Sequence, residues 1–184
     1  MAEVLKRGIV ITTSEHTKDW LPECLESLGN KYPILVVGNN YGGERVNVVN
    51  DWNGFELGGI LRGAEHFDEF IHLMDTCIVK DQKMFDEMFE HEGSVYLCGG
   101  FFSYLGKYRK EILDKVGIPK INNKADAIAL ENSWNRKYLD ADPNAVQYLP
   151  ELPIHTGVFV EKHGRKNMVL DNGAIVKFKG TWSL

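Results

Sequence analysis

The hydrophobic residues of this chain are gathered into short apolar runs that end in polar residues. Runs over residues 8–11, 33–37, 45–49 and 70–74 are rich in Val, Ile and Leu, which is typical of strands buried on both faces of a sheet. Because parallel strands end at the same edge, the polar residues that follow the runs are expected to meet there. The pattern predicts an α/β fold with a mostly parallel central sheet flanked by helices.

Between and after these runs, apolar residues recur at helical spacing. We expect helices over residues 19–28, 84–89, 107–116 and 122–138, with Met and Phe of the second forming a core stripe. Residues 53–64 combine several glycines with a helical pattern. They match neither the phosphate loop nor the dinucleotide fingerprint, which favours a structural turn that leads into a helix.

The later part of the chain adds β-structure and aromatic residues. Residues 95–98 read as a strand, and the aromatics after Gly99-Gly100 suit a sugar platform or, as the favoured reading, a core. Residues 169–178 predict a short C-terminal hairpin around Asp-Asn-Gly. The basic loop at 161–168 either closes over a diphosphate or is solvated surface, and the second reading is slightly favoured.

Size and composition indicate one folded domain. The 184 residues are predicted to form this domain in three parts, residues 1–98, residues 99–160 and the C-terminal loop and hairpin at 161–184. A net charge of −5 gives no reason to expect general nucleic-acid binding. Three widely spaced cysteines indicate neither a disulfide framework nor a zinc site, and the first apolar run is too short to span a membrane. We therefore expect a cytoplasmic protein.

Asp75 directly follows the apolar run that ends at Met74. A carboxylate at the end of a buried strand is costly without a partner, and ligands of open α/β sheets bind at that edge. The sequence suggests that Asp75 faces a divalent metal that carries a diphosphate. A carboxylate that caps a helix or turns the chain would fit the pattern equally well.

The order of these pieces resembles the GT-A nucleotide-sugar glycosyltransferases, and most closely the family-two-like rhamnosyl and galactofuranosyl transferases. The similarity covers roughly residues 7–160, and its motifs are loose one by one. It implies a nucleoside-diphosphate sugar donor, a UDP-sugar as first choice, and a Mn²⁺ or Mg²⁺ ion held by an Asp-x-Asp motif. Here the motif reads Asp75-Thr76-Cys77, so the second carboxylate is missing. His155 is the later ligand that the resemblance offers.

The resemblance implies that residues 1–98 bind the nucleotide sugar and that residues 99–160 bind the acceptor and carry the catalytic group. It also assigns residues to the nucleotide. Those at the strand ends that it places against the base and ribose are Thr12, Thr13, Glu15, Asn39 and Asp51. Arg62 is a candidate for the diphosphate because a guanidinium forms paired hydrogen bonds with phosphate. A solvated surface charge is an equal reading of Arg62.

For the chemical step, the resemblance implies a general base that removes the proton of the acceptor hydroxyl during an inverting attack on the anomeric carbon. Glu131, on the predicted helix 122–138, is the first candidate and Asp126 the second. A charge on the helix surface is the competing interpretation of Glu131.

The sequence therefore predicts a glycosyltransferase that moves a sugar to a glycan or another hydroxyl acceptor. A nucleotidyltransferase is the second reading, although residues 12–18 lack the glycines that such enzymes usually carry after the first strand. A degenerate domain that binds nucleotide without turnover is the third, because the second aspartate of the motif is absent.

Overall fold

The computed structural model describes residues 5–52, 54–121 and 123–180. Asn53 and Asn122, which open two of the segments predicted to lead into helices, lie outside this part. The strands are β1 (Arg7–Thr13), β2 (Ile34–Asn39), β3 (Val48–Asn50), β4 (Glu69–Met74), β5 (Cys77–Val79), β6 (Val95–Tyr96), β7 (Gly106–Arg109), β8 (Val146–Gln147), β9 (Phe159–Lys162), β10 (Arg165–Asp171) and β11 (Ile175–Gly180). The helices are α1 (Leu21–Ser27), α2 (Phe55–His66), α3 (Lys83–Glu90), α4 (Lys110–Val116) and α5 (Lys124–Ala141), with 3-10 turns η1 (Lys18–Trp20) and η2 (Phe102–Tyr104).

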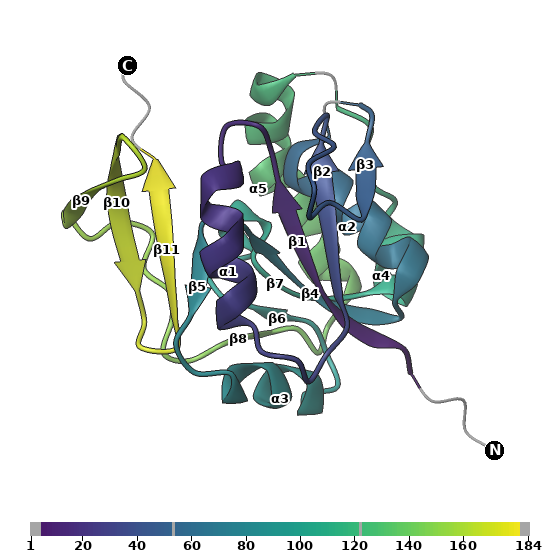
Figure 1. Ribbon diagram of the computed structural model, residues 1–184. Helices are drawn as coiled ribbons and strands as arrows, with labels where there is room; N and C mark the ends of the chain where they lie inside the picture. Colours follow the sequence, from purple (N-terminus) through teal and green to yellow (C-terminus); the bar gives the residue numbers. More distant parts are fainter. Residues whose placement is uncertain (1–4, 53, 122, 181–184) are drawn as a thin grey trace.

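A seven-stranded sheet in the order β3-β2-β1-β4-β7-β6-β8 forms the centre of the molecule (Figure 1). β1 runs parallel to both β2 and β4, and β2 runs parallel to β3, whereas β7 is antiparallel to β4 and β6. Alternate residues of the strands supply two apolar layers, one shared with α1 and α3 and the other with α2, α4 and α5. The predicted α/β fold with a mostly parallel sheet is confirmed.

The strand order reverses at the carboxyl ends of β1 and β4. From β1 the chain moves outward to β2 and β3, and it then returns through α2 to β4 on the other side of β1. Neighbouring connections therefore leave the sheet in opposite directions between β1 and β4, and such a reversal is where open α/β sheets bind ligands. Thr13 ends β1 there, and Asp75 follows β4.

Helix α2 can lie close to this edge because its glycines leave room for polar side chains of the sheet. A Cβ atom on Gly58 would come within 2.4 Å of Asn50 Nδ2, and one on Gly59 within 1.9 Å of Thr12 Oγ1. The glycine-rich segment therefore serves close packing, as its sequence indicated.

A second sheet, β5-β11-β10-β9, extends the molecule beside α1 (Figure 1). The hairpin of β10 and β11 confirms the one predicted around Asp-Asn-Gly, whereas β5 and β9 have no counterpart in the prediction. The predicted basic loop is instead the tight turn between β9 and β10, at His163 and Gly164. β11 pairs with β5, and Phe178 N donates to Thr76 O at 2.9 Å. The hairpin is thereby joined to the segment that directly follows Asp75.

The predicted start of the helix over residues 107–116 was wrong because its first residues pair with distant strands. Residues 107–109 belong to β7, so the helix predicted over 107–116 begins only at Lys110. β7 pairs with both β4 and β6, and this long-range pairing outweighs the local helical pattern. The aromatic residues near it form a core, as favoured, since Phe101 and Tyr108 are fully buried. In the described part of the chain, no helix is both long and apolar enough to cross a bilayer.

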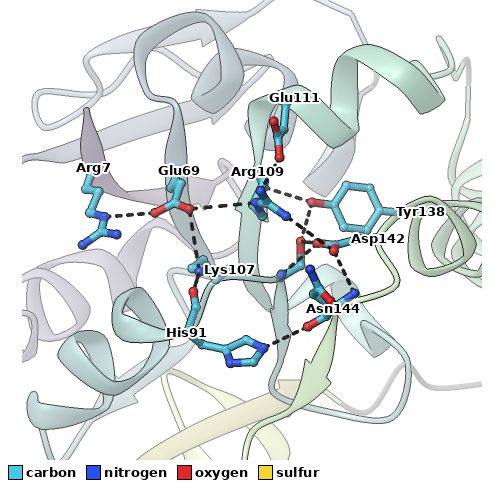
Figure 2. Close-up of polar contacts among 10 residues, drawn as sticks. Arg7, Glu69, His91, Lys107, Arg109, Glu111, Tyr138, Asp142 and Asn144 are labelled. Atoms are coloured by element: carbon cyan, nitrogen blue, oxygen red, sulfur yellow. Dashed lines mark hydrogen bonds and ion pairs between the residues drawn. The ribbon is translucent and has the colours of Figure 1, made fainter. Parts of the chain in front are cut away.

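The amino ends of β1 and β4 and the carboxyl end of the antiparallel β7 carry a network of ion pairs (Figure 2). Glu69, only 6% exposed, bonds Arg7 Nε at 2.9 Å and lies 3.9 Å from both Lys107 Nζ and Arg109 Nε. Strand register produces this arrangement, because Glu69 is directly opposite Arg7 on one side and Arg109 on the other. The network ties three strands together at the end of the sheet away from Asp75.

Candidate functional site

Asp75 is the centre of the candidate site. It is 1% exposed, its Oδ2 accepts a hydrogen bond from Thr13 Oγ1 at 2.6 Å, and its backbone N–H donates to Thr12 O. The other carboxylate oxygen, Oδ1, is buried and has no hydrogen-bond partner among the described residues. Burial raises the pKa of Asp75 to about 7, against the opposing effect of the Thr13 and Thr17 hydroxyls. A buried acceptor without a partner is a costly arrangement that a bound hydrogen-bond donor would relieve.

His72 lies in β4, three residues before Asp75. Its Nδ1 lies 2.8 Å from Tyr104 O and its Nε2 lies 2.8 Å from Thr12 Oγ1. A carbonyl oxygen only accepts, so Nδ1 carries the proton and Nε2 accepts from the Thr12 hydroxyl. Burial lowers the pKa of His72 to about 4, which keeps the ring neutral. The Thr12 hydroxyl therefore donates to His72 and does not point toward a ligand.

The ends of β2 and β3 form the neighbouring corner. Asn39 Oδ1 accepts from Phe55 N at 3.0 Å and so holds the start of α2. Asn50 is fully buried, and its Oδ1 is a further acceptor with no partner in the described residues. Asp51, which was expected to contact the base, is exposed. The structure thus directs attention from Asp51 to its neighbour Asn50.

Glu131 of α5 contacts the turn η2. The Glu131 carboxylate accepts a hydrogen bond from Ser103 N. Phe101, Ser103 and Tyr104 all have positive φ, at 65°, 55° and 57°. Such backbone strain is concentrated at functional sites, where the surrounding contacts must hold it in place. Glu131 is one of those contacts, and it is only partly buried.

The C-terminal hairpin contributes Lys177 to the same region. Lys177 is 4% exposed, and its Nζ lies 3.0 Å from Met74 Sδ. Burial lowers the pKa of Lys177, whereas the carboxylates of Glu56 and Glu131 raise it. Glu56 also raises the pKa of Asp75. Residues of α2, α5 and β11 therefore act on one another across the carboxyl edge of the sheet.

The other predicted residues lie outside this cluster of contacts. Glu15 pairs with Lys18, and Arg62 pairs with Glu65 at 3.0 Å. Arg62 also lies seven residues into α2, about 10 Å along the helix from its start. Asp126 and Asn123 bond reciprocally at the start of α5, which makes Asp126 part of a helix cap. His155 is exposed.

The site offers the Mn²⁺ or Mg²⁺ ion that the resemblance implied one carboxylate, that of Asp75, where an Asp-x-Asp motif has two. Mg²⁺ beside a nucleotide is usually bound through one or two carboxylates together with phosphate oxygens and waters. No group of three or more His, Cys, Asp or Glu side chains in the described residues is arranged to hold a metal, so neither Asp75 nor His155 belongs to one. The other side-chain oxygens near Asp75 are the hydroxyls of Thr13 and Thr17. The buried group beside Met74 is the ammonium of Lys177.

Two open depressions lie at the other end of the sheet. The one beside the Glu69 network has a volume of about 320 Å³ and is lined in part by Arg7, His91 and Asn144. The polar groups there bond mainly to one another, since His91 Nε2 donates to Asn144 O at 2.9 Å (Figure 2). We therefore place the functional site at the carboxyl edge, where buried acceptors remain without partners.

Comparison with known proteins places the fold. No protein-family model and no curated protein matches the chain. A cytidylyltransferase from Leptospira borgpetersenii serovar Hardjo-bovis (strain JB197) has a TM-score of 0.54 and 15% identity, over 79% of this chain and 76% of that one. Residues 1–349 of S. aureus TarS give 0.56 and 10%, over 80% and 59%. The bifunctional glycosyltransferase WbbM gives 0.40 and 12%, over 82% and 40%.

These matches define a class of fold rather than a particular protein. The chain has the GT-A-like α/β fold, with a mostly parallel sheet and an antiparallel hairpin at its C-terminus. At 10–15% identity the likeness concerns the fold alone. The activity must therefore be argued from the site itself.

Of the residues gathered at this candidate site, the sequence predicted Thr13, Asp75 and Glu131, and three others were not among its predictions. Asn50 was passed over for Asp51, although as the last polar residue of an apolar run it carried the same signal as Asn39. Glu56 follows the Gly-Phe turn at the start of α2 and was available as an acidic residue in a first helical turn. Lys177 gave no local signal, because only the pairing of β11 with β5 brings it to the site.

Proposed function

We propose that this protein is a transferase that moves a sugar from a nucleoside-diphosphate sugar to a hydroxyl acceptor. The donor would lie across the carboxyl ends of β1 and β4, with its nucleoside toward the corner formed by β2 and β3. The proposal is carried chiefly by Asp75, whose Oδ1 is buried without a partner where α/β sheets bind ligands. The fold shared with a cytidylyltransferase supports a nucleotide ligand at this edge.

In this proposal Asp75 accepts a hydrogen bond from a hydroxyl group of the donor. Thr13 holds Oδ2, so Oδ1 is the atom that is available to the ligand. Asn50 Oδ1, at the neighbouring strand end, would accept from the nucleoside in the same way. Both interactions satisfy acceptors that are otherwise buried and unpaired.

The chemical step needs a base on the acceptor side, and Glu131 is the proposed one. Its carboxylate takes the proton of the acceptor hydroxyl while the hydroxyl oxygen attacks the anomeric carbon. The bond from that carbon to the β-phosphate oxygen breaks, and the nucleoside diphosphate leaves with the bonding electrons. The hydrogen bond from Ser103 N fixes the orientation of the carboxylate.

The experiment is a screen of donors. Purified protein is incubated with UDP-, GDP-, ADP- and dTDP-sugars, and release of nucleoside diphosphate is measured with water or added sugars as acceptors. We expect release from at least one of these donors. A parallel reaction with CTP and sugar phosphates tests nucleotidyl transfer, for which release of pyrophosphate is diagnostic. Pyrophosphate release without nucleoside-diphosphate release would replace the proposed activity by the second one.

Replacing Asp75 by asparagine is expected to lower kcat/KM for the donor by about 10-fold, because the donor hydroxyl then bonds to a neutral amide oxygen instead of a carboxylate. The melting temperature should stay the same or rise, since the change removes a buried carboxylate with an unpaired oxygen. Activity and thermal unfolding are measured on the same preparation.

The matched control is Asp114→Asn, an exposed aspartate of α4 that pairs with Lys110. Both quantities should be unchanged in this variant. An Asp75→Asn protein with wild-type kcat/KM would show that the unpaired oxygen does not meet the donor.

A further inference from the structure

A buried lysine at the carboxyl edge has no role in the fold that accounts for its position. Lys177 is 4% exposed, and no carboxylate in the described part of the chain lies within ion-pair distance of its ammonium group. Among the described residues, its hydrogen bond is to the thioether sulfur of Met74, which is a weak acceptor. A buried charge of this kind costs several kcal/mol unless it is compensated. The other lysine of comparable burial, Lys107, has both a carbonyl partner and Glu69.

The ammonium group of Lys177 lies where the groups of the site converge. It acts electrostatically on His72 of β4 and on Cys98, and it responds to Glu56 of α2 and Glu131 of α5. Its sulfur neighbour belongs to Met74, the residue directly before Asp75. The positive charge of Lys177 therefore lies near the carboxylates of Glu56 and Glu131, beside the strand end where the donor is proposed to bind.

The lysine is held in place by backbone pairing rather than by its side chain. Lys177 is directly opposite Cys77 in the register of β11 and β5, and the next residue, Phe178, donates to Thr76 O. This pairing fixes the lysine relative to Asp75, two residues before Cys77. The thioether that covers the ammonium belongs to a partly exposed, flexible side chain that can move aside when an anion binds.

Resting on the proposed function, we propose that Lys177 binds the diphosphate of the donor and supplies the positive charge that a divalent metal ion would otherwise supply. The chain has Cys77 where an Asp-x-Asp motif has its second carboxylate, and Lys177 is paired with that position. A cation at this point neutralises the charge that develops on the departing diphosphate. Donor binding and turnover then require no Mn²⁺ or Mg²⁺.

The test measures the affinity of UDP, CDP, GDP and ADP by calorimetry, each in EDTA, for wild-type protein and for Lys177→Met. At least one diphosphate should bind the wild-type protein in EDTA. The variant should bind it at least about tenfold more weakly, which is the loss expected for one charged hydrogen bond. Affinity for the matching nucleoside, which has no phosphate, should change less than about twofold in the same variant.

Two further variants keep the result interpretable. Lys166→Met removes an exposed lysine of the same hairpin, whose Nζ lies 4.9 Å from the centre of the Phe159 ring, and should bind like the wild-type protein. Lys177→Gln replaces the methionine variant if that protein does not fold.

Equal affinity of wild-type protein and either Lys177 variant would overturn the inference and leave the proposed function standing. Loss of wild-type binding in EDTA, with recovery in Mn²⁺, would also overturn it. If none of the four diphosphates binds the wild-type protein, the proposed function fails first and the role of Lys177 falls with it.

Discussion

Replacing Glu131 by glutamine is expected to lower kcat for sugar transfer by about 100- to 10,000-fold, the range typical of a lost general base. The change is well suited to the structure because the glutamine Oε1 can still accept from Ser103 N, as the carboxylate does now. The support of the strained η2 turn is therefore kept while the basic group is removed. Steady-state release of nucleoside diphosphate, together with KM for the donor, is the measurement.

Two aspartates serve as controls for Glu131. Asp140→Asn changes an exposed charge on the same helix and should leave kcat unaltered. Asp126→Asn alters the helix cap and is expected to cost at most about 1 kcal/mol of stability, with kcat retained. If Glu131→Gln keeps the wild-type kcat and Asp126→Asn loses it, the base is Asp126. If both keep it, the base comes from neither residue.

Replacing Glu69 by glutamine is expected to reduce the free energy of unfolding by about 2–4 kcal/mol, because a buried carboxylate that compensates several cations is lost. Arg7, Lys107 and Arg109 would then face one another without it. The value is placed below the upper limit for buried pairs because the Arg7 side chain is 38% exposed. Urea unfolding followed by circular dichroism gives the difference.

Glu111→Gln is the matched control for Glu69. Glu111 pairs with the same arginine, Arg109, but its side chain is 59% exposed, so the change should cost less than about 1 kcal/mol. Similar losses in the two variants would mean that burial does not decide the strength of this network. Nucleotide affinity should be unchanged in both, because Glu69 begins β4 whereas Asp75 directly follows its other end.

Much of the fold was predictable because its central strands are encoded locally. The apolar runs that became β1, β2 and β4 are buried on both faces, and their polar ends mark the carboxyl edge of the sheet. Asp75 and Thr13 were recognised for the same reason: each lies directly at the end of such a run. The parallel pairing of β1 with β4 brings these two residues together.

The remainder depends on pairings between distant parts of the chain. Lys107 and Tyr108 read as the start of a helix, and only pairing with β4 and β6 makes them a strand. The sequence predicted Lys177 only as one residue of the C-terminal hairpin. It is buried at the site because β11 pairs with β5, a strand with no strong local signal. Asn50 is buried and Asp51 is exposed. The local pattern does not predict which of two polar residues at a strand end is buried.

The central claim is that the nucleotide binds at the carboxyl ends of β1 and β4. A crystal structure of the protein with a nucleoside diphosphate tests it most directly. The claim predicts density for the ligand beside Asp75 Oδ1 and Asn50, with the phosphates toward Lys177. Density for the nucleotide in the depression near His91 and Asn144, with none beside Asp75 and Asn50, would contradict it.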